Sequence, residues 1–192
     1  MIAYLKGKFV NKGPALLHIE VNGVGYEVHI SLNTYSAIKD LEEGLIHTYL
    51  HIREDAHLLY GFAGKAEKEM FLLLTGVNGI GSSTARMMLS SMKPGELTNA
   101  IVNANIRALE SIKGIGKKTA ERIVLELKDR LSKQEIQAHS TEQTAKTPAA
   151  DAVDALVTLG ISRNLAEQAV QKAAAAGMAD VGELVKRALQ IL

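Results

Sequence analysis

A short glycine motif occurs twice in the middle of the chain, and this repeat constrains the fold more than any other feature. Residues 77–81 read Val-Asn-Gly-Ile-Gly, and residues 112–116 read Ile-Lys-Gly-Ile-Gly. A shift of 35 positions (79 to 114) superimposes the two Gly-Ile-Gly triplets and also places Ala85 on Ala120. Because helix-like runs precede and follow each copy, we predict two units of helix, tight turn and helix.

The composition of the turn indicates what it could bind. Glycine on each side of the isoleucine lets the backbone adopt a positive φ and come close to a ligand. The isoleucine can point inward and hold the turn on its own helices. The second glycine lies at the start of the next helix, where unpaired N–H groups and the helix dipole favour an anion. A phosphate is the obvious anion.

Two better-known glycine motifs do not fit these turns. A dinucleotide-binding fingerprint needs a third glycine at the positions of Thr84 and Thr119. A P-loop needs a glycine where the chain has Ser111. One turn of this kind could serve only to connect two helices. Two in-register copies, the second followed by Lys117 and Lys118, favour a ligand-binding role.

The positive charge of the chain is concentrated in the segment that holds both turns. The net charge of the 192 residues is only +1. Residues 1–64 carry 5 Lys and Arg against 7 Asp and Glu, residues 65–132 carry 11 against 7, and residues 133–192 carry 6 against 7. The middle segment therefore has a net charge of +4, which favours a polyanionic partner. Because this excess is modest, tight binding would need several subunits that pool their basic faces.

Hydrophobic patterning predicts an α+β multidomain chain. Residues 1–64 alternate short β-branched runs with turn signals, such as Asn22-Gly23, and fit a small OB-fold-like β-barrel with a short helix over residues 36–41. Residues 65–132 form the all-α tandem helix-hairpin-helix segment, whose last helix covers 117–131. Residues 133–148 are polar and small, and predict a flexible linker. Residues 149–192 predict a bundle of three short helices similar to ubiquitin-associated domains.

The sequence also excludes several classes of site. It has no cysteine, hence no disulfide and no thiolate chemistry. Its histidines lack metal-ligand spacing, and we find no catalytic residues and no cofactor motif. The N-terminus lacks a signal-peptide pattern, and no apolar stretch is long enough to cross a bilayer, so we expect a cytoplasmic protein without membrane contact.

Two further sets of residues are candidates for function. Glu54 and Asp55 lie at the tip of a predicted hairpin; they are either solvated turn residues or a negative prong that repels DNA phosphates. In the C-terminal bundle, apolar residues could face a partner, although most must also build the bundle's own core. The candidates are Leu156, Leu159, Ile161, Leu165, Val170 and Leu184.

The order of these parts resembles the RuvA family of bacterial Holliday-junction branch-migration proteins over the whole chain. The most specific stretches are residues 112–122 (IKGIGKKTAER) and 53–62 (REDAHLLYGF). The resemblance implies a homotetramer, alone or paired face to face with a second one, that holds a four-way DNA junction open during recombination and DNA repair. It also implies that the acidic prong, Glu54 and Asp55, is a pin at the junction centre.

The resemblance further assigns the DNA-backbone contacts and the protein partners. The backbone-binding residues would be Asn78, Gly79, Gly81, Ser82, Ser83, Gly114, Gly116, Lys117, Lys118, Thr119 and Arg122. Ser82 and Ser83 stand where relatives often carry a lysine, so the first turn would hold phosphate through amides and hydroxyls. A hexameric RuvB ATPase would supply the motor and contact the C-terminal bundle, and the RuvC junction resolvase is a further expected partner.

Two other functions remain compatible with helix-hairpin-helix units and a small helical bundle. Such units also serve as DNA grips in repair nucleases and glycosylases, which need an acidic metal site or a base pocket in addition. Alternatively, the chain could be a scaffold whose C-terminal bundle binds ubiquitin-like folds.

Overall fold

The computed structural model describes residues 1–141, 147–175 and 180–191, with the backbone alone for 133–141. The chain divides into two compact units, Met1–Lys133 and Gln134–Leu192. None of the helices in the described ranges is long and apolar enough to cross a membrane.

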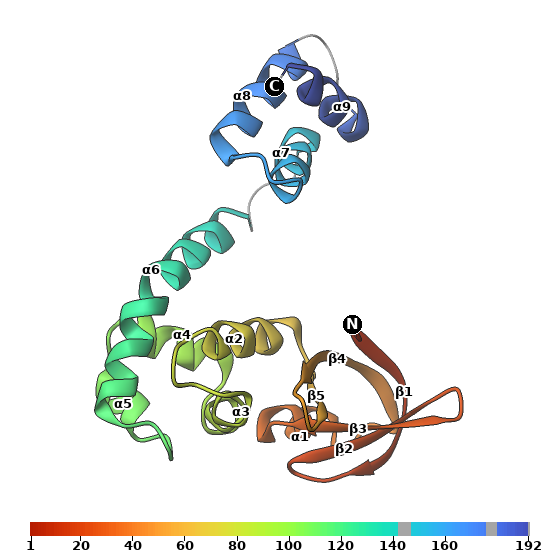
Figure 1. The fold of residues 1–192 in the computed structure, drawn as a ribbon, viewed down its shortest axis with the longest axis vertical. Helices are drawn as coiled ribbons and strands as arrows, with labels where there is room; N and C mark the ends of the chain where they lie inside the picture. Colours follow the sequence, from red (N-terminus) through yellow and green to blue (C-terminus); the bar gives the residue numbers. More distant parts are fainter. Residues whose placement is uncertain (142–146, 176–179, 192) are drawn as a thin grey trace. The chain divides into compact units, whose positions relative to one another are not determined.

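The first unit begins with a closed β-barrel (Figure 1). Strand β3 pairs in parallel with β5, whereas the other neighbours are antiparallel, and β1 pairs with β4 to close the order β1-β2-β3-β5-β4. The strands are β1 (Tyr4–Lys12), β2 (Leu16–Val21), β3 (Val24–Ile30), β4 (Glu43–Ile52) and β5 (His57–Phe62). Asn22 and Gly23, with φ of 50° and 82°, form the predicted hairpin turn. The barrel predicted for this segment is thus confirmed.

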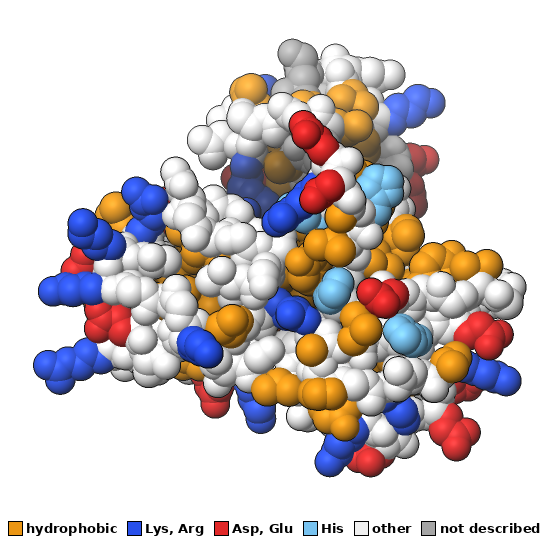
Figure 2. All heavy atoms as spheres, turned by 60° about the horizontal axis from the view of Figure 1, so that its bottom comes forward, with side chains coloured by type: hydrophobic (Ala, Val, Ile, Leu, Met, Phe, Trp, Pro, Cys, Tyr) orange, Lys and Arg blue, Asp and Glu red, His pale blue; other side chains and the backbone are white. Residues whose placement is uncertain are grey.

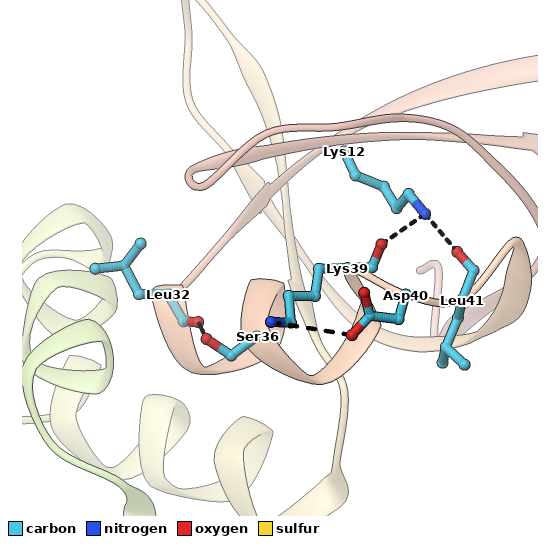
Figure 3. A network of polar contacts seen from close by, with 6 residues as sticks. All are labelled: Lys12, Leu32, Ser36, Lys39, Asp40 and Leu41. Atoms are coloured by element: carbon cyan, nitrogen blue, oxygen red, sulfur yellow. Dashed lines mark hydrogen bonds and ion pairs between the residues drawn. The ribbon is translucent and has the colours of Figure 1, made fainter.

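The short helix of the barrel begins earlier than predicted. Helix α1 (Leu32–Ile38) starts after Ser31, whose hydroxyl oxygen accepts a hydrogen bond from the Thr34 amide at 3.0 Å. At the other end, Lys12 Nζ donates to the carbonyls of Lys39 and Leu41 at 2.8 and 2.7 Å (Figure 3). This lysine satisfies carbonyls beyond the helix C-terminus and ties them to strand β1.

The helical part of the first unit packs against strand β5 of the barrel, which has a buried cluster of its own. The helices are α2 (Lys65–Thr75), α3 (Ser82–Ser91), α4 (Pro94–Val102), α5 (Ile106–Glu110) and α6 (Lys117–Thr141). The ring of Phe71 in α2 lies 4.9 Å from that of Phe62 and 5.2 Å from that of Tyr60, both in β5. All three side chains belong to one buried cluster that continues through α3, α4, α5 and α6. The boundary predicted between residues 64 and 65 therefore falls inside one compact unit.

A buried carboxylate reinforces this junction between barrel and helices. Glu67, in the first turn of α2, is only 6% exposed. Its carboxylate accepts hydrogen bonds from the hydroxyls of Ser31 and, at 2.6 Å, Thr34. Thr34 Oγ1 in turn accepts one from the Ala63 amide at 3.0 Å. Burial raises the pKa of Glu67, and the hydrogen bonds from Ser31, Thr34 and Ala63 oppose that rise.

The second unit contains a small helical bundle. Its helices are α7 (Pro148–Thr158), α8 (Arg163–Ala175) and α9 (Val181–Ile191). Pro148 occupies the first turn of α7, and Asp180 Oδ1 caps α9 by accepting from the amides of Gly182 and Glu183 at 2.9 and 3.2 Å. Helix α6 continues to Thr141, so the first part of the predicted linker 133–148 is helical, while 142–146 lie outside the described residues.

The raised pKa of Glu67 predicts a pH-dependent stability. A carboxyl whose pKa is higher in the folded than in the unfolded chain favours folding most below its ordinary value, near pH 4.3. That contribution declines as the pH rises through the higher folded pKa. We therefore expect the free energy of unfolding of the wild type, relative to Glu67→Gln, to fall between about pH 4.3 and neutral pH.

Urea unfolding of the wild type and Glu67→Gln across this pH range measures the difference. Glu67→Ala is the matched control for the hydrogen bonds: it leaves two buried hydroxyls without their acceptor, so it should be about 1–3 kcal/mol less stable than Glu67→Gln at any pH. Parallel pH profiles for the wild type and Glu67→Gln would contradict the raised pKa.

Candidate nucleic-acid interface

The two glycine turns have the same geometry. Helices α2 and α3 flank the first turn, and α5 and α6 flank the second. Gly79 and Gly114 have φ of 92° and 90°, values that favour glycine. Ile80 and Ile115 are each 5% exposed, and their amides donate to the carbonyls of Val77 and Ile112, both at 3.0 Å. The prediction of two equivalent helix-hairpin-helix turns with an inward isoleucine is confirmed.

The glycines of both turns face open space. A side chain added at Gly79, Gly81, Gly114 or Gly116 would meet no atom within 4 Å. Gly81 is the N-cap of α3, and no side chain caps that helix; its carbonyl accepts from the Ala85 amide at 2.9 Å. The first amides of a helix have no partner within the helix. At α3 they lie beside an exposed turn, where an anion could accept from them.

The second turn is the more basic of the two. Lys117 and Lys118 at the start of α6 are exposed, and Thr119 is half-buried. Lys113 is also exposed and occupies the position that Asn78 has in the first turn. It is absent from the sequence-based candidates, although the repeat that singles out Asn78 also points to it.

The first turn presents few cations of its own. Asn78 and Ser83 are exposed, as predicted for contact residues, but Ser82 is only 3% exposed, so its hydroxyl is not a surface group. Arg122 of α6 reaches this turn instead: its Nη1 donates to the Asn78 carbonyl at 3.2 Å. The structure thus links the two turns through a residue that the resemblance assigns to DNA contact.

The distribution of charge over the first unit agrees with that assignment. On the face shown in Figure 2, lysine and arginine side chains gather along the left edge, which is formed by the helical part. This part, residues 65–132, carries the net charge of +4. The barrel segment, residues 1–64, has a net charge of −2.

The acidic residues Glu54 and Asp55 lie exposed at the tip of the β4–β5 hairpin. The tip is closed by the Arg53 amide, which donates to the Ala56 carbonyl at 2.8 Å. The Arg53 side chain donates from Nε to His51 Nε2 at 3.0 Å. This bond directs the guanidinium back along β4, so the positive charge of Arg53 is held toward the strand.

Two histidines of the barrel lie against the ring of Tyr60. The rings of His29 and His51 lie 5.6 and 6.4 Å from that of Tyr60. Burial lowers the pKa of His29, as does the nearby Arg86, while Glu27 opposes the change. Within the described part of the chain, no group of three or more potential ligands could hold a metal ion.

The C-terminal candidates divide into core and surface residues. Leu156, Val170 and Leu184 are 0%, 2% and 1% exposed and form the core of the bundle. They are therefore not available to a partner on the surface of this unit. Ile161 is half-buried against the same core. Leu159 and Leu165, 64% and 52% exposed, remain as candidates for a partner-facing surface.

Comparison with known families and proteins covers nearly the whole chain. Residues 1–61 match the RuvA N terminal domain, residues 71–129 match the SAM-like helix-hairpin-helix tandem, and residues 147–192 match the RuvA C-terminal domain.

Similar proteins include three that are each named Holliday junction branch migration complex subunit RuvA. The protein of Cytophaga hutchinsonii is 47% identical over 173 residues, which cover 88% of this chain and 87% of the relative. The protein of Flavobacterium psychrophilum is 43% identical over 193 residues and all of both chains. The protein of Citrifermentans bemidjiense is 42% identical over 198 residues, 100% of this chain and 99% of the relative. The barrel, the paired turns and these matches together place the chain in the RuvA family.

Proposed function

We propose that this chain binds four-way DNA junctions without sequence preference and serves as the junction-binding subunit of a branch-migration complex. The observation that carries the proposal is the pair of exposed Gly-Ile-Gly turns in one compact unit whose helical part has a net charge of +4. The names of the family relatives support it. They do not favour the alternative of a nuclease or glycosylase.

Main-chain amides and exposed lysines would both bind phosphates. The amides of the turns fix the position of a phosphate, and Lys117 and Lys118 add charge at the second turn. Contacts of this kind carry no sequence information, so selectivity must come from the shape of the junction. A tetramer would present four such surfaces around one junction, and the combined affinity would exceed that of one subunit by orders of magnitude.

The acidic hairpin would supply the selectivity for shape. Glu54 and Asp55 are exposed on the same compact unit as the two turns. Carboxylates repel the closely spaced phosphates of a continuous duplex. At the centre of an open junction the strands diverge, and a negative pin can stand there with less repulsion. Junctions would thus be preferred over plain duplex.

Movement of the junction would be driven by another protein. The chain has no P-loop at its glycine turns, so we propose that it is not itself the ATPase and that a RuvB-type motor hydrolyses ATP. The C-terminal bundle would contact that motor through Leu159 and Leu165, its exposed leucines. The complex would act in the cytoplasm on chromosomal DNA.

Removal of the lysines at the second turn should weaken junction binding and its dependence on salt. Each phosphate contact contributes about −0.9 to the slope of log K against log salt concentration. Replacing both Lys117 and Lys118 by alanine should therefore make the slope less negative by up to about 2. Titration of a labelled four-way junction from 50 to 200 mM salt measures it. The control, Lys128→Ala with Arg130→Ala, removes the same charge elsewhere on α6; an equal loss of slope there would contradict a specific role for the turn.

Neutralisation of the acidic pin should reduce discrimination between DNA shapes. In the Glu54→Gln, Asp55→Asn variant, we expect tighter binding of plain duplex with little change for the junction, because the repulsion acts mainly on duplex. The ratio of the two dissociation constants is the measurement. Asp40→Asn with Glu42→Gln removes two exposed charges from the same barrel and should leave the ratio unchanged. If the junction preference survives in the pin variant, the proposed role of the pin is wrong.

Polar replacement of the exposed leucines should separate motor contact from DNA binding. Leu159→Ser with Leu165→Ser should weaken binding of a RuvB-type ATPase, because each loses exposed apolar area that a partner would bury. Junction affinity should stay at the wild-type value. Leu189→Ser, which changes another exposed leucine (48%) of the same unit, is the matched control. Wild-type stimulation of the ATPase by the double variant would place the motor contact elsewhere.

A further inference from the structure

The two turns are not equivalent in how the rest of the protein holds them. In the repeat, Arg122 of α6 corresponds to Met87 of α3, and Lys113 corresponds to Asn78. Arg122 reaches across to the opposite turn and donates to the Asn78 carbonyl at 3.2 Å. A methionine has no hydrogen-bond donor, so Met87 cannot make the reciprocal bond to the carbonyl of Lys113. The hydrogen bond between the two copies of the repeat therefore runs only from α6, in the second copy, to the first turn.

The Asn78 carbonyl, to which Arg122 donates, belongs to the same peptide group as the Gly79 amide. The chain has no cis peptide bond among the described residues. In a planar trans peptide the carbonyl oxygen and the following N–H point in opposite directions. A bond that holds the Asn78 carbonyl toward α6 therefore also directs the Gly79 amide away from α6. Gly79 can adopt either sign of φ at little cost, so its own residue type does not fix this peptide plane.

The first turn depends on its amides more than the second does. The side chains beside the first turn are those of Asn78 and Ser83, which are exposed, and of Ser82, which is buried. The second turn, in contrast, is followed by two exposed lysines. The cation on α3, Arg86, is engaged elsewhere, since its Nη1 donates to the Ala15 carbonyl in the barrel at 2.9 Å. A site that binds an anion mainly through amides needs those amides held in direction.

The Arg122 side chain is itself held in place. Its Nε lies 3.8 Å from Glu126 Oε1, one helical turn further along α6, while Nη1 contacts Asn78. The side chain is 51% exposed, so the Glu126 pair is a weak contact that orients the guanidinium rather than a strong ion pair. The guanidinium is rigid and planar, so fixing its plane also fixes the direction in which Nη1 donates to the Asn78 carbonyl.

We propose, on the basis of the junction-binding function, that Arg122 is a positioning residue for the first turn: it holds the Asn78–Gly79 peptide so that the Gly79 amide faces the phosphate. Its main contribution to DNA binding is made through the opposite turn, 44 residues away in the sequence. A direct phosphate contact would instead act independently of the first turn. The two roles predict different couplings between Arg122 and the two glycines.

A double-mutant cycle on the full chain separates these roles. Arg122→Met should weaken junction binding about tenfold, the size of one hydrogen bond from a charged group. Gly79→Ala strains the first turn, because alanine rarely adopts a φ of 92°. In the Gly79→Ala background, Arg122→Met should change the affinity less than about twofold, since the turn on which it acts is already disturbed. In the Gly114→Ala background it should keep its full effect. Additive effects with Gly79→Ala would overturn the proposal.

Hydrogen exchange of the free protein tests the same link without DNA. The Ile80 amide is bonded within the first turn, to the Val77 carbonyl at 3.0 Å. Arg122→Met should speed its exchange severalfold, whereas Arg130→Met, an equal change at an exposed position of α6, should not. Unchanged exchange in a variant that folds with the wild-type melting temperature would overturn the positioning role and leave junction binding itself untouched. If the wild-type protein does not bind a four-way junction, the proposed function is refuted. The effect of Arg122 on the first turn, measured by hydrogen exchange, would still stand.

Discussion

The buried isoleucine in the middle of each turn is the contact on which the binding surface depends. Ile80 and Ile115 are almost fully enclosed, and both belong to the same buried cluster as the flanking helices. Burial of one such side chain contributes about 1.5–3 kcal/mol, enough to anchor a short turn. With the isoleucine inside, the glycines on either side must face outward, and the main chain between the helices becomes the exposed surface. The same apolar contact that stabilises the fold therefore presents the amides.

Local sequence signals predicted most of the fold, because they reflect local physics. Strand β5, the Asn22-Gly23 hairpin and both glycine turns follow from alternation and from positions that need a positive φ. The start of α1 was predicted wrongly because Ser31, an ordinary serine in the sequence, acts as its cap. The helical extension of α6 to Thr141 could not be read from its composition, which is polar and lacks a periodic apolar stripe.

Individual side-chain environments that depend on long-range contacts could not be predicted. Nothing near Glu67 in the sequence indicates that Ser31 and Thr34, more than thirty positions earlier, will surround its carboxylate. Likewise, Leu156 and Leu159 are both leucines near the end of one helical pattern, yet one is 0% and the other 64% exposed. The hydrogen bond from Arg122 to the Asn78 carbonyl likewise joins residues 44 positions apart and has no signal in the sequence. Sequence identifies which residue types can contact DNA, but only the fold decides which of them are already engaged.

The packing of helix α2 on strand β5 holds the positively and negatively charged parts of the first unit in one body. Taken alone, a net charge of +4 on the helical part and −2 on the barrel would amount to a weak and unselective attraction for DNA. Phe62 and Tyr60 of the barrel pack on Phe71 of α2. The glycine turns, which would attract DNA phosphates, and the acidic hairpin, which would repel them, therefore belong to one compact unit. In the proposed function, this arrangement of both signs would favour DNA shapes that contact the turns and avoid the carboxylates. Under the proposed function, selectivity for shape would therefore need both the turns and the acidic hairpin, held in one body by the packing of α2 on β5.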